Sequence, residues 1–174
     1  MFVPAHRKKL NALTCCAVLT ALSAVIGILC KDLFTFGVYY RVTFENLPII
    51  MAGLMFGPIA GAVCGCAADV ISCLLSTNPA VNPVITLGAC AVGVVSGLFS
   101  NRLKSNGDKK YVRLATGFAH LLGQVAIKSA AKMLVFGMPW WGIFIGAAIS
   151  AIVFWVESRI ICRLLIDQKL IGKY

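Results

Sequence analysis

The sequence predicts an all-α integral membrane protein, a bundle of six transmembrane helices that form a single domain. Of its 174 residues, 60% are hydrophobic and 13% are charged, about half the charged fraction of a typical soluble domain. The mean hydropathy is +0.90. Several uncharged runs are long enough to cross a bilayer, and basic residues gather at the ends of these runs, as they do in membrane proteins.

The first half of the chain predicts three helices. Residues 10–30 form an uncharged span between Lys9 and Lys31. The next apolar run is too long for one helix and is interrupted at Gly57-Pro58, because proline inside a helix removes a hydrogen bond and clashes with the preceding turn. We therefore predict helices over 46–56 and 59–76, and Asn46 is a suitable N-cap.

The second half predicts three more helices. The stretch "TNPAVNP" has the composition of a loop, and an apolar helix over 84–100 follows it. A charged loop, "NRLKSNGDKKYVR", separates this helix from the next one, over 114–136. The turn "GMPWWG" then precedes a last helix over 142–165.

The distribution of positive charge predicts the orientation. Twelve of the 16 Lys and Arg residues lie at the N-terminus, in the loop 101–113 or in the C-terminal tail. Six helices place these three segments on one side, so the positive-inside rule puts both termini in the cytoplasm. The same distribution argues against nucleic acid as the reason for the net charge of +10.

The sequence carries no motif for a metal, a cofactor or catalysis. Its eight cysteines lie in or beside apolar segments without a C-x-x-C pair, and the two histidines complete no zinc pattern. We interpret the cysteines as packing residues. Nucleotide-binding and hydrolase motifs are absent from the sequence. Such a protein can bind a solute, but it needs a partner to move that solute uphill.

Small residues recur every fourth position in four of the predicted helices, a spacing that allows helices in lipid to approach closely. In the first helix this small face covers nearly the whole span, which leaves room for a partner protein. The pairs are Ala17 and Ala21, Gly61 and Gly65, Gly93 and Gly97, and Gly142 and Gly146.

A ladder of polar residues lies inside the fifth predicted helix, in "HLLGQVAIKSAAK". His120, Gln124, Lys128 and Lys132 follow one another over a rise of roughly 18 Å. Lysine near the centre of a membrane helix costs about 2.5–3.5 kcal/mol, so Lys128 is expected to face a cavity or a partner. Lys132 lies nearer the outer surface, where it either extends to the interface or joins the site. His120 is either a hydrogen-bonded packing residue or part of the site.

Asp69 is the expected internal partner of Lys128, as a structural pair or as part of a ligand site. One carboxylate cannot neutralise two lysines, so we expect surplus positive charge in the outward half of the bundle and an anionic ligand there. The aromatic residues of the outer loops are either an interfacial belt or a stacking surface for a flat ligand. They are Phe34, Phe36, Tyr39, Tyr40, Phe44, Trp140 and Trp141.

Two stretches, "RVTFENLPIIMAGLMFGPIAGAVCGCAADVISCLL" and "NPVITLGACAVGVVSGL", resemble the substrate-binding (S) subunits of energy-coupling factor (ECF) vitamin transporters, with the folate branch nearest. The resemblance covers about residues 10–165. Its most specific parts are Arg41 with Phe44 and Leu47-Pro48, Ala52-Gly53, Phe56-Gly57-Pro58, Ala68-Asp69, and Asn82-Pro83 with Thr86.

This resemblance implies the six-helix S-component fold in a bacterial plasma membrane, with no enzymatic activity of its own. It implies a vitamin site near the outer surface under the first, third and fifth loops. It also implies docking on one coupling membrane protein and two ATPase subunits, with Ala17 and Ala21 against the coupling protein and ATP-driven toppling of the S subunit. The chain departs from the family at "VNPVIT", where an aromatic, glycine-containing stretch is expected.

Folate, or a reduced folate, is the ligand that the residues favour. Lys128 and Lys132 suit its two glutamate carboxylates, and Asp69 suits the guanidinium-like donor edge of its pterin. Arg41 is expected to close over the ligand. The other candidate binding residues are Phe44, Asn82, Thr86, Gln124 and Trp140.

Three alternatives stay open at this point. The first is an S subunit for riboflavin, pantothenate or a queuosine precursor. The second is an intramembrane enzyme that uses His120 and Asp69. The third is a cation-excluding pore or a structural membrane protein.

Overall fold

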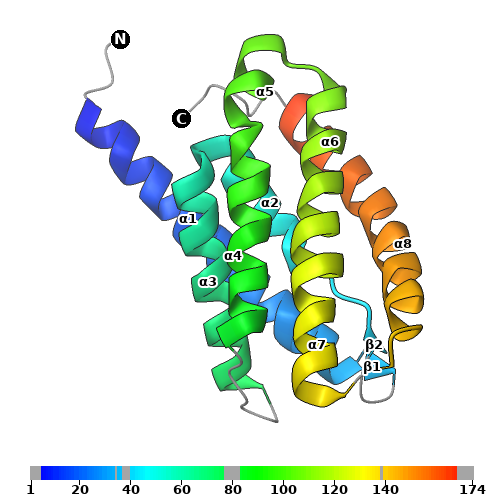
Figure 1. Ribbon diagram of the computed structural model, residues 1–174. Coiled ribbons are helices and arrows are strands. Elements are labelled where there is room, and N and C mark those ends of the chain that lie inside the picture. Colours follow the sequence, from blue (N-terminus) through cyan, green and yellow to red (C-terminus); the bar gives the residue numbers. More distant parts are fainter. Residues whose placement is uncertain (1–4, 34, 37–39, 77–82, 138, 168–174) are drawn as a thin grey trace.

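The computed structural model describes residues 5–33, 35–36, 40–76, 83–137 and 139–167, and nearly all of them are helical (Figure 1). The helices are α1 (Ala5–Leu33), α2 (Asn46–Phe56), α3 (Pro58–Leu75), α4 (Pro83–Leu98), α5 (Ser100–Asn106), α6 (Lys109–Ala119), the π-helix η1 (His120–Ile127), α7 (Lys128–Phe136), α8 (Gly142–Cys162) and the π-helix η2 (Arg163–Asp167). Two short strands, β1 (Thr35–Phe36) and β2 (Tyr40–Arg41), pair antiparallel after α1.

The break between α2 and α3 lies where proline predicts it. Gly57 has a φ of 99°, and its N–H donates to the Gly53 carbonyl at 2.8 Å, which closes the last turn of α2. Pro58 is then the first residue of α3, a position where its missing N–H costs nothing.

The prediction of a charged loop over 101–113 is wrong. Most of it is helical, in α5 and in the first turn of α6. The chain reverses at Gly107, which has a φ of 67° and whose N–H donates to the Leu103 carbonyl at 2.8 Å. Helix propensity continues through these charged residues because Lys, Arg and Leu are good helix formers. The helix that carries the polar ladder therefore begins at Lys109, and the first helix, α1, also exceeds its predicted span.

From Lys109 to Phe136 the chain is helical without a break, but its central part is the π-helix η1. A π-helix bonds residue i to residue i+5, so its turns are wider than those of an α-helix. The ladder is therefore not a regular α-helical spiral: His120 is the first residue of η1, and Lys128 follows its last residue.

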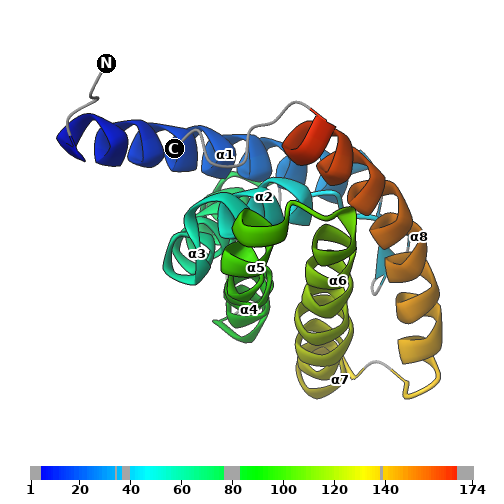
Figure 2. The ribbon, with the colours of Figure 1, turned by 90° about the horizontal axis from the view of Figure 1, so that it is seen from above.

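The core lies around α2, which is buried over most of its length and packs between α3, α4 and α1. Ile49, Ile50 and Leu54 have exposed fractions of 2% or less. The predicted close approach through small residues is confirmed for α3 and α4: a Cβ on Gly61 or on Gly93 would overlap the backbone of the other helix. In Figure 2, α1 lies across one side of the bundle.

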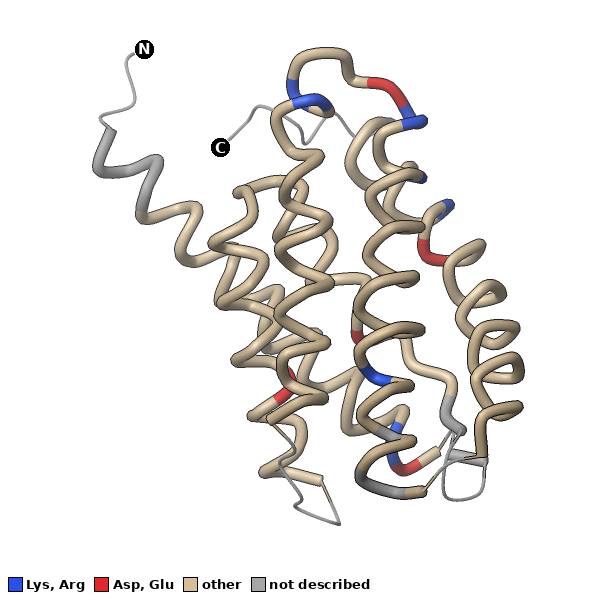
Figure 3. Tube along the Cα trace, viewed as in Figure 1, with Lys and Arg blue, Asp and Glu red and all other residues tan. Residues whose placement is uncertain are grey.

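Among the described residues, four segments are long and apolar enough to cross a membrane: Leu10–Leu33, Pro58–Leu75, Pro83–Asn106 and Gly142–Ile166. Large apolar side chains are exposed along them, among them Leu13, Ile59, Leu87 and Ile152, which is the arrangement that lipid requires. Figure 3 shows most of the described basic residues at one end of the molecule, around the turn from α5 to α6 and the end of α8. The total of six spans and the side on which each terminus lies remain predictions.

Candidate functional site

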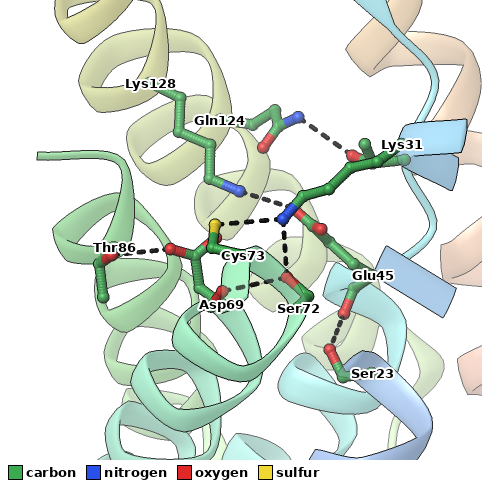
Figure 4. Close-up of polar contacts among 10 residues, drawn as sticks. Ser23, Lys31, Glu45, Asp69, Ser72, Cys73, Thr86, Gln124 and Lys128 are labelled. Carbon is green, nitrogen blue, oxygen red and sulfur yellow. Dashed lines mark hydrogen bonds and ion pairs between the residues drawn. The ribbon is translucent and has the colours of Figure 1, made fainter. Parts of the chain in front are cut away.

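A buried ion pair stands at the centre of the candidate site. The Lys128 ammonium lies 2.9 Å from Glu45 Oε1, and both side chains are about 5% exposed (Figure 4). Glu45 directly precedes α2, and its backbone carbonyl accepts a hydrogen bond from Ser23 Oγ at 2.6 Å. The predicted partner, Asp69, was therefore wrong: the carboxylate that pairs with Lys128 comes from the segment before α2.

Glycines on two neighbouring helices leave the space for this pair. A Cβ on Gly88 of α4 would stand 2.8 Å from Cγ of Lys128, and a Cβ on Gly27 of α1 would stand 3.0 Å from Glu45 Oε2. Larger residues at these two positions would displace the lysine stem or the carboxylate.

Asp69 instead belongs to a second group of contacts beside the pair. Its Oδ2 accepts a hydrogen bond from Thr86 Oγ1 at 2.7 Å, and its backbone carbonyl accepts one from Ser72 Oγ at 3.0 Å. Lys31, near the end of α1, donates to Ser72 Oγ at 3.0 Å and to Cys73 Sγ at 3.1 Å. The carboxylate of Asp69 is 4% exposed, and its Oδ1 has no hydrogen-bond partner among the described residues.

Gln124 completes the set from the π-helix. Its Nε2 donates to Thr43 Oγ1 at 3.3 Å, while its Oε1 is buried and unpaired within the described part of the chain. We call these groups the polar cluster. Its members are Lys31, Thr43, Glu45, Asp69, Ser72, Thr86, Gln124 and Lys128, and they come from α1, α3, α4, η1, α7 and the segment before α2.

The structure places the remaining predicted residues in different ways. Trp140 lies apart from the polar cluster: it is 69% exposed, and its ring packs edge-on against Phe144 at 6.4 Å, which suits the interfacial belt. Phe44 is half-buried beside Glu45. Asn82 lies outside the described residues, and so do the side chains of Arg41 and Lys132.

His120 faces away from the polar cluster, toward α8. Its Nε2 lies 2.7 Å from Glu157 Oε2, its Nδ1 lies 3.2 Å from Ser150 Oγ, and its ring is edge-on to Phe154 at 6.4 Å. Glu157 is fully buried. This agrees with the prediction of a hydrogen-bonded histidine and disagrees with a shared site for His120 and Asp69.

Sequence reasoning did not place five of these residues among the site candidates: Lys31, Thr43, Glu45, Ser72 and Glu157. Glu157 is a lone carboxylate inside an apolar run, the same signal that singled out Lys128, and applying that signal to α8 would have found it. Lys31 served only as the boundary of the first span, although the structure folds its ammonium back onto α3. No sequence pattern marks that contact.

The model of the family described as "ECF transporter, substrate-specific component" matches residues 11–156. The chain belongs to this family. Among curated proteins, this S component is 29% identical over 97 residues to the folate transporter FolT of Clostridium novyi (strain NT). The aligned residues are 56% of this chain and 55% of that protein, so the chain matches about half the length of this relative. It is 28% identical over 118 residues to the uncharacterized protein MG098 homolog of Mycoplasma pneumoniae (strain ATCC 29342 / M129 / Subtype 1), covering 68% of the chain and 24% of that protein.

Two solved structures share the fold of this S component. A crystal structure of FolT bound with folic acid aligns with a TM-score of 0.70 at 21% identity, over 90% of this chain and 95% of that one. The S component for biotin from an ECF-type ABC transporter aligns with a TM-score of 0.71 at 16% identity, over 94% of both chains. The predicted S-component fold is thus confirmed. The two scores are nearly equal although the two proteins serve different vitamins, so the fold does not discriminate between ligands.

Proposed function

We propose that this S component captures folate or a reduced folate from outside the cell and delivers it inward together with an ATP-driven ECF module. The observation that carries the proposal is the polar cluster, which holds two buried acceptor oxygens without partners among the described residues, Asp69 Oδ1 and Gln124 Oε1. A buried acceptor left unpaired costs about 1–3 kcal/mol, and a ligand that brings donors removes this cost. The likeness to the folate transporter of Clostridium novyi supports folate as that ligand.

The pterin of folate has the donors that these acceptors need. Its 2-amino group and the adjacent ring N–H form a donor edge, which matches a carboxylate oxygen such as Asp69 Oδ1. Thr86 holds the other oxygen of Asp69 at 2.7 Å, which fixes the orientation of the carboxylate. Gln124 Oε1 offers a second acceptor, from η1, whereas Asp69 belongs to α3 (Figure 4).

The carboxylates of folate need cations that are not already neutralised. In the half of the chain that we place outward there are four basic residues, Lys31, Arg41, Lys128 and Lys132, and three acidic ones, Asp32, Glu45 and Asp69. The surplus is a single positive charge. Because Glu45 neutralises Lys128, we assign the folate carboxylates to Lys132 and Arg41, and we give Lys128 the role of positioning Glu45 and the wall of the site.

The partner of the S component in this proposal is one coupling membrane protein with two ATPase subunits. Ala17 and Ala21 support it, because both are exposed on α1 while Ser23 and Ala24 face the bundle. A face of small residues allows another helix to approach closely. Changing both alanines to tryptophan should abolish copurification with the coupling protein and leave folate binding intact.

Calorimetry with the purified protein tests the ligand. Folate should bind with saturation, and 6-methylpterin, the uncharged pterin fragment, should bind more weakly. Lys132→Ala should weaken folate binding but leave 6-methylpterin binding unchanged. Asp69→Asn should weaken both ligands, because it alters the group that faces the pterin.

Biotin and riboflavin are the matched controls in this experiment. Saturable binding of either of them without binding of folate would overturn the ligand and leave the family unaffected. Equal losses of folate and 6-methylpterin binding in Lys132→Ala would overturn the carboxylate role. Mass spectrometry of small molecules that copurify with the protein provides an independent identification.

A further inference from the structure

An apolar groove runs between α6 and α8, and its lining includes no member of the polar cluster. Its cavity of about 470 Å³ is lined by Lys110, Arg113, Leu114, Gly117, Phe118, Leu121 and Phe154. This volume is within the range of roughly 300–1,000 Å³ that small-molecule sites occupy. Figures 1 and 2 both show α6 and α8 side by side along this face.

The groove has a polar end and an apolar body. The lining residues of the ladder helix repeat at intervals of three and four, so they form one continuous stripe. The stripe begins with Lys110 and Arg113, which are exposed, and continues with apolar residues as far as Leu121. From Lys110 to Leu121 the helix rises about 16 Å, close to half of the roughly 30 Å hydrocarbon core of a bilayer.

The walls of the groove are fixed by aromatic contacts. Phe118 stacks on Phe99 with ring centres 5.9 Å apart, and Phe154 is held edge-on by His120. Gly117 leaves the floor open, because a Cβ there would meet only the ring of Phe154, at 3.5 Å. The groove is therefore a formed feature of the surface, and a longer side chain at position 117 would fill it.

The positive charges of Lys110 and Arg113 at the polar end of the groove favour an anionic ligand. Neither Lys110 nor Arg113 forms an ion pair within the described part of the chain, and the surrounding end of the molecule is basic (Figure 3). Basic residues beside a membrane attract anionic lipid headgroups. We propose that this groove binds one anionic phospholipid, with an acyl chain along the apolar stripe and the phosphate against Lys110 and Arg113.

Native mass spectrometry of the detergent-purified protein tests this proposal, using an equimolar mixture of dioleoylphosphatidylglycerol and dioleoylphosphatidylcholine. The wild type should retain the anionic lipid with a preference of about thirtyfold, the scale that two basic residues at an anionic surface can supply. The double variant Lys110→Gln/Arg113→Gln should lose the preference. Gly117→Leu should reduce retention of both lipids.

The matched control is Arg102→Gln/Lys104→Gln, which removes the same charge from α5, outside the groove. It should keep the wild-type preference, and folate binding should be unchanged in every variant, which also verifies that the variants fold. If this control lost the preference for the anionic lipid to the same extent, the effect would be a general attraction of anionic lipid to basic residues, and the proposed site would be overturned. Displacement of the lipid by millimolar inorganic phosphate would identify a free-anion site instead. A second copy of the chain whose binding depends on Lys110 and Arg113 would identify a protein interface instead.

Discussion

At the scale of single residues, the described part of this S component contains two buried pairs, Lys128 with Glu45 and His120 with Glu157. Each member would be costly alone, since a charged side chain in the membrane needs a partner or a cavity. The first pair adjoins the proposed ligand site, and the second adjoins the wall of the α6–α8 groove. His120, at the start of the polar ladder, therefore lies beside the groove, and Lys128, further along the ladder, lies beside the proposed ligand site.

Breaking the Lys128–Glu45 pair from either side should destabilise the protein. Removing one partner of a buried pair leaves the other charge uncompensated and costs about 3–5 kcal/mol. Lys128→Met and Glu45→Gln should each lower the free energy of unfolding by this order. The double variant should lose less unfolding free energy than the sum of the two single losses. Thermal unfolding in detergent measures these differences. Strictly additive losses would show that the two side chains do not interact.

The pair of His120 and Glu157 should depend on hydrogen bonding. Glu157→Gln keeps a group that can bond to His120, whereas Glu157→Leu leaves the imidazole nitrogen unsatisfied at a cost of about 1–3 kcal/mol. The leucine variant should therefore unfold at a lower temperature than the glutamine variant. Asp108→Asn, at an exposed position, is the control and should leave the unfolding temperature unchanged. The reverse order of the two Glu157 variants would contradict the hydrogen-bonding role.

At the scale of elements, α4 is the helix on which most of the packing depends, since it contacts α2, α3 and the ladder helix. Its glycines permit these contacts: Gly93 meets the backbone of α3, and Gly88 meets the stem of Lys128. Small residues at such crossings replace the hydrophobic driving force that lipid does not supply between helices.

Adding one methyl group to α4 should therefore be more damaging than adding one to α8. Gly93→Ala forces a Cβ into the backbone of Gly61, and overpacking of this kind costs about 1–3 kcal/mol. Gly146→Ala meets only Ser129 Oγ, at 3.9 Å, and should be neutral or slightly stabilising because alanine favours a helix. Comparison of the two unfolding temperatures checks this. Similar losses in both variants would contradict the close α3–α4 contact.

At the scale of the whole molecule, the two ends differ in charge. Most of the described basic residues lie at the end where α5 turns into α6 (Figure 3). The end of α1 and α7, which carry Lys31 and Lys128 of the polar cluster, lie toward the other end (Figure 1). The positive-inside rule predicts that the basic end lies in the cytoplasm, and in that orientation the polar cluster would lie toward the outside.

Epitope tags at the two termini test this orientation. Antibody should label neither tag on intact spheroplasts and should label both after the membrane is permeabilised. A tag inserted between residues 137 and 142, in the turn before α8, should be labelled on intact spheroplasts. Labelling of either terminus before permeabilisation would overturn the orientation.

The sequence predicted the helices better than the contacts between them. Apolar run lengths and the Gly57-Pro58 break depend on local chemistry, so α2 and α3 agree with the prediction within a residue or so. The partner of Lys128 depends on how the segment before α2 folds against α1, which no local pattern encodes. Asp69 was predicted as the partner of Lys128 because a carboxylate inside an apolar run is unusual. Glu45 directly precedes a helix, a position where carboxylates are common.

The π-helix has a consequence for how this gene can change. Both buried pairs flank η1, with His120 at its first residue and Lys128 just after its last. The wider turns of η1 set the rotation of Lys128 relative to His120, so a codon deletion between these two residues should change the direction in which one pair points. Insertions and deletions should therefore be rare between positions 120 and 128, while the turns at Gly107 and Gly137 tolerate changes in length.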